Sequence, residues 1–150
     1  MTDWHIAQLN VGRALYDLDD PRMAGFMGRL DEINALADAA PGFVWRLQSD
    51  AGNATDIKLT DDPAFIVNLS VWQTIEQLKD FAYNSAHAPI MAQRRNWFEV
   101  PTEAYLTLWW VPISTPPTAE EALARLETLR CQGASAAAFD FQTIFPPASA

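Results

Sequence analysis

The chain has one cysteine, few basic side chains and no long apolar run, and each scarcity excludes a class of protein. Cys131 has no second cysteine to pair with, which excludes an internal disulfide and a zinc site built from cysteines. No apolar run approaches the roughly 20 residues that span a bilayer. The N-terminus lacks the basic start and apolar core of a signal peptide. We therefore expect a cytoplasmic protein without a membrane segment.

Positive charge is also scarce. Ten Lys and Arg stand against 19 Asp and Glu, so the net charge is -9 and the isoelectric point about 4.4. A negative field repels phosphate backbones and anionic membranes, and the pair Arg94 and Arg95 is too small a patch to reverse it. We expect neither nucleic acid nor membrane as a partner. There is no glycine-rich phosphate loop and no metal-ligand spacing, so no metal site is predicted.

Apolar side chains, by contrast, are plentiful, at 49% of 150 residues with six tryptophans. That length and composition predict one domain, 1–150, with a core of its own. A capping box formed by Thr118 and Glu121 predicts the start of a C-terminal helix at about 118–132. Gly133 ends this helix, and a tail follows at 133–150.

Four segments alternate between apolar and other side chains and are predicted as β-strands, namely 5–11, 43–48, 65–72 and 105–111. Asp20 and Pro21 predict the N-cap and first position of a helix after the first strand. A second helical region follows residue 72, and Pro89 must interrupt it because its ring clashes with the preceding turn. The resulting order, β-α-β-β-α-β with an extra C-terminal helix, predicts an α+β, ferredoxin-like subunit.

Each predicted strand has an apolar face and a face that mixes polar and aromatic side chains. We expect helices to cover the apolar faces. On the mixed faces, Trp72 and Trp109 would leave large apolar surfaces in water unless something covers them. The simplest cover is the same face of a second copy, which predicts a homodimer. The residues predicted on the mixed faces are Gln8, Asn10, Arg46, Gln48, Asn68, Ser70, Trp72, Thr107 and Trp109.

Five segments of the chain are informative in combination. They are HIAQLNVGR, PGFVWRLQ with the following GNAT, NLSVW, LWWVP and residues 87–98. In sum they resemble an uncharacterised bacterial family, a domain of unknown function in the dimeric α/β-barrel superfamily. The resemblance covers residues 5 to about 145. It implies a ferredoxin-like subunit whose sheet pairs across a dimer to form a barrel. It implies no reaction, because the superfamily contains cofactor-free monooxygenases, haem-degrading monooxygenases and binding proteins.

His87 is the first candidate for catalysis, as an acid, a base or a ligand. In the haem-degrading relatives a histidine after the third strand binds iron and an asparagine lies on the first strand, which Asn10 could match. The tryptophan expected about ten residues before the histidine is absent, because position 77 is Gln. The alternative is that His87 bridges the helix junction. No cofactor is the favoured expectation, and haem is the lesser one.

Arg94 and Arg95 are the other catalytic candidates. Successive residues on a helix point about 100° apart, so at most one of them faces a pocket. A buried arginine stacked on Trp97 would hold a carboxylate or phenolate through its planar guanidinium group. The alternative is an ion pair on the surface.

The ligand-binding candidates would line a pocket between helices and sheet, and they are Asn10, Arg46, Asn68, Trp72, Tyr83, Trp97 and Trp109. Tryptophans also fill ordinary cores and interfaces, so packing is the alternative for them. The favoured hypothesis is a monooxygenase-like protein that binds a small hydrophobic or aromatic molecule. The alternatives are a non-catalytic small-molecule-binding or structural homodimer, and a haem-binding or haem-degrading protein. The sequence leaves open whether the protein is an enzyme.

Overall fold

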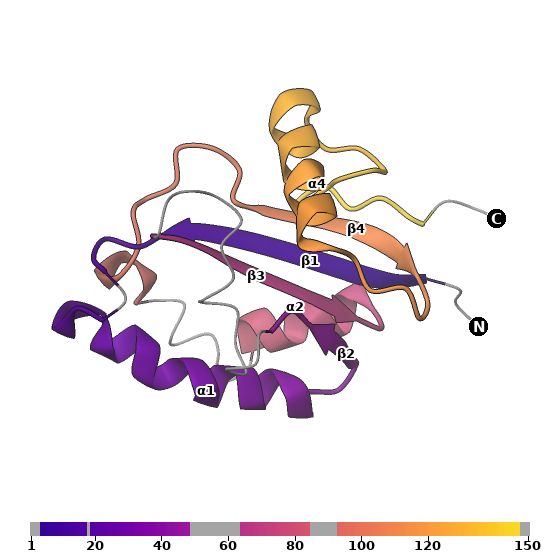
Figure 1. Ribbon diagram of the computed structural model, residues 1–150. Helices are drawn as coiled ribbons and strands as arrows, with labels where there is room; N and C mark the ends of the chain where they lie inside the picture. Colours follow the sequence, from indigo (N-terminus) through magenta and orange to yellow (C-terminus); the bar gives the residue numbers. More distant parts are fainter. Residues whose placement is uncertain (1–3, 18, 49–63, 85–92, 148–150) are drawn as a thin grey trace.

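The computed structural model of the protein describes residues 4–17, 19–48, 64–84 and 93–147 (Figure 1). Its centre is an antiparallel sheet of four strands in the order β2-β3-β1-β4. The strands are β1 (Trp4–Arg13), β2 (Phe43–Arg46), β3 (Phe65–Trp72) and β4 (Leu106–Pro112). The helices are α1 (Ala24–Ala39), α2 (Ile75–Asn84) and α4 (Ala119–Gln132), with short 3-10 turns η1 (Pro21–Met23) and η2 (Arg94–Asn96). The predicted α+β, ferredoxin-like order with an added C-terminal helix is confirmed.

The helix starts depend on local capping. Asp20 Oδ1 accepts the backbone N–H of Arg22 at 2.8 Å, and Pro21 begins η1, which leads into α1. Thr118 Oγ1 accepts the backbone N–H of Glu121 at 3.1 Å at the start of α4. Both N-caps lie where the sequence predicts them, because each satisfies a backbone donor that the first helical turn leaves free.

One face of the sheet is mostly apolar, and α4 covers it. Ala7 lies opposite Val71 on one side and Trp109 on the other, so all three share this face. Ala122 and Leu126 of α4 pack against it, and Figure 1 shows α4 above the sheet. We call this surface the apolar face. Its buried apolar members are Ala7, Leu9, Val11, Val67, Leu69, Val71, Trp109 and Val111.

The opposite face combines polar and apolar side chains and lies under α1 and α2. Gln8 is opposite Ser70 in β3 and Leu108 in β4, which puts the three on this side of the sheet. Ala37 of α1 and Leu78 of α2 belong to the same buried cluster as Leu108. In Figure 1, α1 and α2 lie below the sheet. We call this surface the mixed face. Its members include Ile6, Gln8, Asn10, Asn68, Ser70, Trp72 and Leu108.

The structure changes the predicted cover of the mixed face, whereas a helix covers the apolar face as expected. The mixed face was expected to meet a second copy, yet α1 and α2 of the same chain occupy it, so that interface is wrong. Thr107 and Trp109 were also assigned to the mixed face, but their pairing with Leu9 and Ala7 puts them on the apolar face. The physical reason is that alternation identifies which side chains share a face of one strand. It does not specify the register between strands or the element that covers the face.

After α4 the chain returns to the mixed side along the free edge of β4. Phe139 exchanges backbone hydrogen bonds of 2.7 and 2.9 Å with Leu108 and is fully buried. Trp110 Nε1 donates to the carbonyl oxygen of Phe145 at 2.8 Å. The tail therefore docks on the edge strand, as its phenylalanines suggest.

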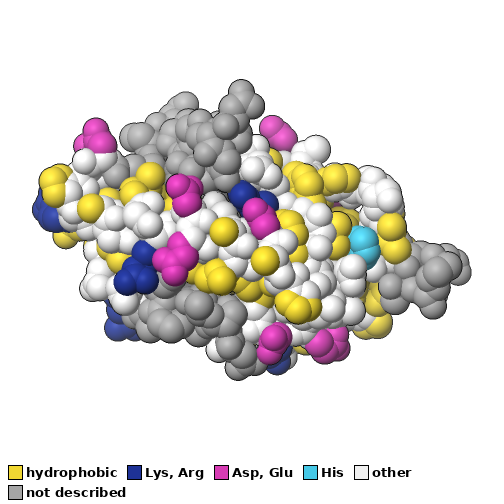
Figure 2. Space-filling view, turned by 90° about the horizontal axis from the view of Figure 1, so that it is seen from below, with side chains coloured by type: hydrophobic (Ala, Val, Ile, Leu, Met, Phe, Trp, Pro, Cys, Tyr) yellow, Lys and Arg dark blue, Asp and Glu magenta, His cyan; other side chains and the backbone are white. Residues whose placement is uncertain are grey.

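Figure 2 views the molecule from the side on which α1 lies. Charged side chains of both signs are interspersed with hydrophobic ones on this face. No helix in the described part of the chain is long and apolar enough to cross a membrane.

Candidate ligand-binding site

Two adjoining cavities lie between the mixed face and the helices below it. Their volumes are about 140 and 220 Å³. Both are lined by the same five residues, Asn10, Ile33, Asn34, Arg46 and Asn68, so they form two lobes of one site. We call them the Trp97 lobe and the Trp72 lobe, after the tryptophan in each wall.

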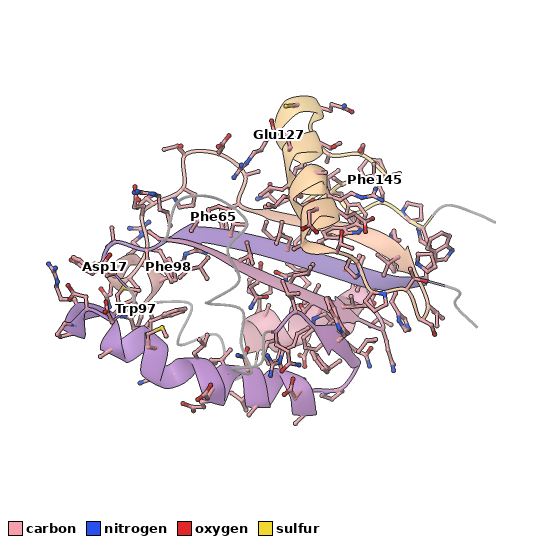
Figure 3. All side chains as sticks on the ribbon, viewed as in Figure 1. Asp17, Phe65, Trp97, Phe98, Glu127 and Phe145 are labelled. Atoms are coloured by element: carbon pink, nitrogen blue, oxygen red, sulfur yellow. The ribbon has the colours of Figure 1, made fainter. Side chains whose placement is uncertain are left out.

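The Trp97 lobe has aromatic walls at the end of the sheet. Trp97 follows η2, is 6% exposed, and accepts the backbone N–H of Leu15 at its carbonyl oxygen at 2.8 Å. The Phe26 ring of α1 lies 5.8 Å from the Trp97 ring and 5.0 Å from the Phe98 ring, centre to centre. Figure 3 shows Trp97 and Phe98 between the sheet and α1. Such tilted and edge-on contacts hold the rings in place beyond simple burial.

Two glycines make room for these rings. A Cβ atom at Gly12 would lie 3.0 Å from the Phe98 ring, and one at Gly25 would lie 3.2 Å from the Trp97 ring. Both distances are shorter than ordinary carbon contacts. The rings therefore approach β1 and α1 as closely as they do because neither position carries a side chain.

The Trp72 lobe is lined by a hydrogen-bond network that is buried at Ser70 and partly buried at Asn68. Gln8 Nε2 donates to Asn68 Oδ1 at 3.1 Å and to Ser70 Oγ at 3.0 Å. Trp72 Nε1 donates to the same Ser70 Oγ at 2.9 Å. Because both acceptor sites of that hydroxyl oxygen are engaged, Ser70 has only its O–H left to offer to a ligand.

Asn10 carries a buried polar atom that no described residue satisfies. Its Oδ1 is buried and has no hydrogen-bond partner among the described residues. Asn10 also lines both lobes. A buried polar atom without a partner costs about 1–3 kcal/mol, and a ligand with a suitable hydrogen-bonding group would remove that cost.

The arginines differ sharply in their surroundings. Arg46 forms a forked ion pair with Asp38, with Nε–Oδ1 at 2.8 Å and Nη2–Oδ2 at 3.3 Å. The guanidinium carbon of Arg94 lies 4.5 Å from the centre of the Tyr105 ring, and Arg94 lines the Trp97 lobe. Arg95 is exposed and lines neither lobe. Of the adjacent pair, Arg94 therefore faces the site, stacked on Tyr105 and not on Trp97 as predicted.

Most predicted ligand-binding residues meet at this site. Asn10, Arg46 and Asn68 line both lobes, Trp72 and Tyr83 line the Trp72 lobe, and Trp97 lines the lobe named after it.

Two predicted site residues are not at this site in the described structure. The prediction that Trp109 lines the ligand pocket is wrong, because Trp109 is fully buried on the apolar face and lines neither lobe. His87 lies outside the described residues, as does the predicted break before Pro89.

Sequence reasoning did not identify several residues that line the cavity. They lie on α1 and on strands β1 and β3. Phe26, Arg29, Leu30, Ile33 and Asn34 of α1 line the Trp97 lobe at spacings of three and four, the period of one helix face. That spacing was the available signal. Gln8 and Ser70 were assigned to the mixed face, but their hydrogen bonds depend on strand register, which the sequence leaves open.

Comparison with known proteins gives the family. Residues 5–150 match the family described as "Domain of unknown function (DUF3291)". The chain belongs to DUF3291. The resemblance to an uncharacterised family, inferred from the motifs, is thereby confirmed. No curated protein matches this DUF3291 chain.

Solved structures similar to this DUF3291 chain include Rv0793 from Mycobacterium tuberculosis, with a TM-score of 0.48 and 14% identity over 77% of this chain and 98% of that one. A protein from Nitrosomonas europaea, provisionally assigned as an antibiotic biosynthesis monooxygenase, has a TM-score of 0.48 and 14% identity over 79% of this chain and 97% of that one. At these values the likeness carries no information about activity.

The DUF3291 site can thus offer three kinds of interaction. Apolar and aromatic walls enclose a hydrophobic body, Asn10 meets a polar group, and Arg94 meets negative charge. No described residue that lines either lobe carries an imidazole. A haem held by a histidine therefore depends on His87, which lies outside the described residues.

Proposed function

We propose that this DUF3291 protein is monooxygenase-like and binds a small hydrophobic or aromatic molecule in the two-lobed cavity. The observation that carries the proposal is Asn10 Oδ1, a buried acceptor without a described partner at the junction of the two lobes. Native proteins leave few such atoms, and each calls for an explanation. A bound molecule that hydrogen-bonds to Asn10 supplies one.

The walls support a molecule that is mostly apolar. Phe26, Trp97 and Phe98 line one lobe. In the other, the Trp72 and Phe81 rings lie 5.1 Å apart at 31°. Pockets lined by hydrophobic and aromatic side chains, with a few polar groups, are the usual form of small-molecule sites.

The proposal also includes oxidation of the bound molecule, as the term monooxygenase-like implies. Arg94 would stabilise negative charge on an oxygen atom of the bound molecule, since a guanidinium in a partly dry site interacts strongly with an anion. His87 remains the predicted acid or base. A non-catalytic binding protein would use the same cavity, and oxygen uptake by the protein with its ligand bound distinguishes the two.

Two tryptophan substitutions on α1 test the binding site. Ile33 lines both lobes, whereas Ala35 is exposed on the outer side of the helix. We expect calorimetry with indole and 2-naphthol to detect binding to the wild type and to Ala35→Trp. We expect Ile33→Trp to abolish binding because its ring fills the space that the lobes share. Equal binding by both folded variants would contradict this location.

A further inference from the structure

We infer that the ligand is an organic carboxylate whose carboxylate group is bound by Arg94 in the Trp97 lobe. This inference rests on the proposed binding function and specifies its ligand. The ligand would combine one negative charge with an apolar body that packs on Phe26 and Trp97.

The first support is the sign of the charge around the lobe. Arg29, Arg46 and Arg94 line the Trp97 lobe, and its described lining residues include no Asp or Glu. The protein as a whole carries a net charge of -9. A cluster of cations in an acidic protein creates a local field that favours an anion there, whereas the rest of the surface repels it.

The second support is that no described carboxylate neutralises two of these cations. Arg46 is paired with Asp38, but no carboxylate of the described residues forms an ion pair with Arg29 or Arg94. Five of the eight arginines do have such partners: Arg13, Arg22, Arg46, Arg125 and Arg130. Of the three arginines without one, two line this lobe and the third is Arg95.

The third support is the way Arg94 is held. Its guanidinium group lies over the Tyr105 ring, with 4.5 Å between the guanidinium carbon and the ring centre. Stacking on a ring engages the flat face of the group, and the N–H donors lie in its plane. A carboxylate can therefore accept two parallel hydrogen bonds from the edge of Arg94.

A further polar side chain in the wall, Asn10, complements this arrangement. The Asn10 amide carries one acceptor and two donors. No hydrogen bond to a described residue fixes its Oδ1. It can therefore turn its NH2 group toward a carboxylate or its oxygen toward a hydroxyl. Arg29 is exposed and lines the same lobe, which suits it to attract the anion from solution.

Matched acids and amides test the charge of the ligand. The probes are phenylacetate, 3-phenylpropionate and 2-naphthoate, each compared by calorimetry at pH 7 with its primary amide. We expect at least one acid to bind the wild type about tenfold more tightly than its amide, the difference expected of a charge-assisted hydrogen bond. Arg94→Gln should remove this preference. Arg95→Gln makes the same charge change one residue away and should retain it.

The possible results separate this inference from the proposed function. Equal binding of every acid and its amide to the wild type would overturn the carboxylate and leave the cavity intact. A preference that Arg94→Gln and Arg95→Gln reduce equally would overturn Arg94 as the binding group. Failure of all probes, and of indole and 2-naphthol, would overturn both proposals. If Arg94→Gln does not fold, Arg29→Gln replaces it and should weaken acid binding but not amide binding.

Discussion

Gln8 on β1 and Ser70 on β3 lie directly opposite each other, and Gln8 Nε2 donates a 3.0 Å hydrogen bond to Ser70 Oγ. The same oxygen accepts the indole N–H of Trp72 at 2.9 Å. One hydroxyl thus satisfies two buried donors beneath α2. Gln8, Ser70 and the Trp72 indole are tolerated under the helices because they satisfy one another.

Replacement of Ser70 by alanine should destabilise the protein. Gln8 retains Asn68 as an acceptor, but Trp72 Nε1 loses the acceptor of its 2.9 Å bond. We expect the free energy of unfolding to fall by about 1–3 kcal/mol, the cost of an unpaired buried donor. Urea denaturation measures the change, with the exposed Gln73→Ala as the control. A loss no larger than that of the control would contradict the network.

Asn10→Leu should have opposite effects on stability and on binding. The leucine is close in size and removes a buried acceptor that has no described partner. We therefore expect the free energy of unfolding to stay the same or rise by about 1 kcal/mol, while affinity for the small-molecule probes falls. Urea denaturation and calorimetry measure the two effects. A clear loss of stability would instead assign Asn10 a structural role.

The stability that Asp20 contributes at the start of η1 should depend on pH. Hydrogen bonds from the Arg22 side chain, and then from its backbone N–H, lower the pKa of Asp20 from 3.8 to about 2. A carboxyl group with a lowered pKa stabilises the folded chain above pH 3.8, and this contribution is lost as the pH falls toward about 2. We expect wild type to melt at a higher temperature than Asp20→Asn at pH 7, and the difference to become much smaller at pH 2. A difference that is independent of pH would contradict this linkage.

Cys131 should react slowly with alkylating agents. Its Sγ donates to Glu127 Oε1 at 3.2 Å, and this hydrogen bond is the main cause that raises the pKa of the thiol. Figure 3 shows Glu127 on α4. Since the thiolate is the reactive form, Glu127→Gln should react with iodoacetamide at pH 7.5 several-fold faster than wild type. Glu120→Gln makes the same charge change elsewhere on α4, and an equal gain in that variant would exclude the hydrogen bond as the cause.

A homodimer remains a prediction, and its interface must avoid the mixed face. We expect light scattering at micromolar concentration to give twice the subunit mass of 16.7 kDa, and the mass of a single chain would contradict it.

Trp109→Lys should act on the subunit itself and not on a dimer interface, because Trp109 is fully buried beneath α4. We expect it to unfold the subunit, at a cost of about 3–5 kcal/mol or more.

The succession of elements could be read from the sequence because its signals are local. Phe65–Trp72 has the predicted bounds of β3, since its alternation is uninterrupted and Ala64 and Gln73 flank it. Asp20 and Thr118 cap helices through bonds to residues two and three positions away. Such contacts are formed within one turn and need no information about the rest of the chain.

The candidate site was predictable in part of its composition but not in its arrangement. Asn10, Asn68 and Trp72 were chosen from strand alternation, and the strand register brings them to one face. Arg94 and Arg95 are equivalent in sequence, and only the packing of η2 against Tyr105 distinguishes them.

By itself, then, the sequence determined the order of strands and helices, the helix caps and the alternation within each strand. The tertiary structure decided which helix covers which face, and so whether the polar residues line a cavity or meet a partner. Trp72 and Trp109 illustrate the difference, since both belong to well-formed strands but lie on opposite faces. The physical reason is that alternation is a property of one strand, whereas cover depends on long-range packing between elements that lie far apart in the chain.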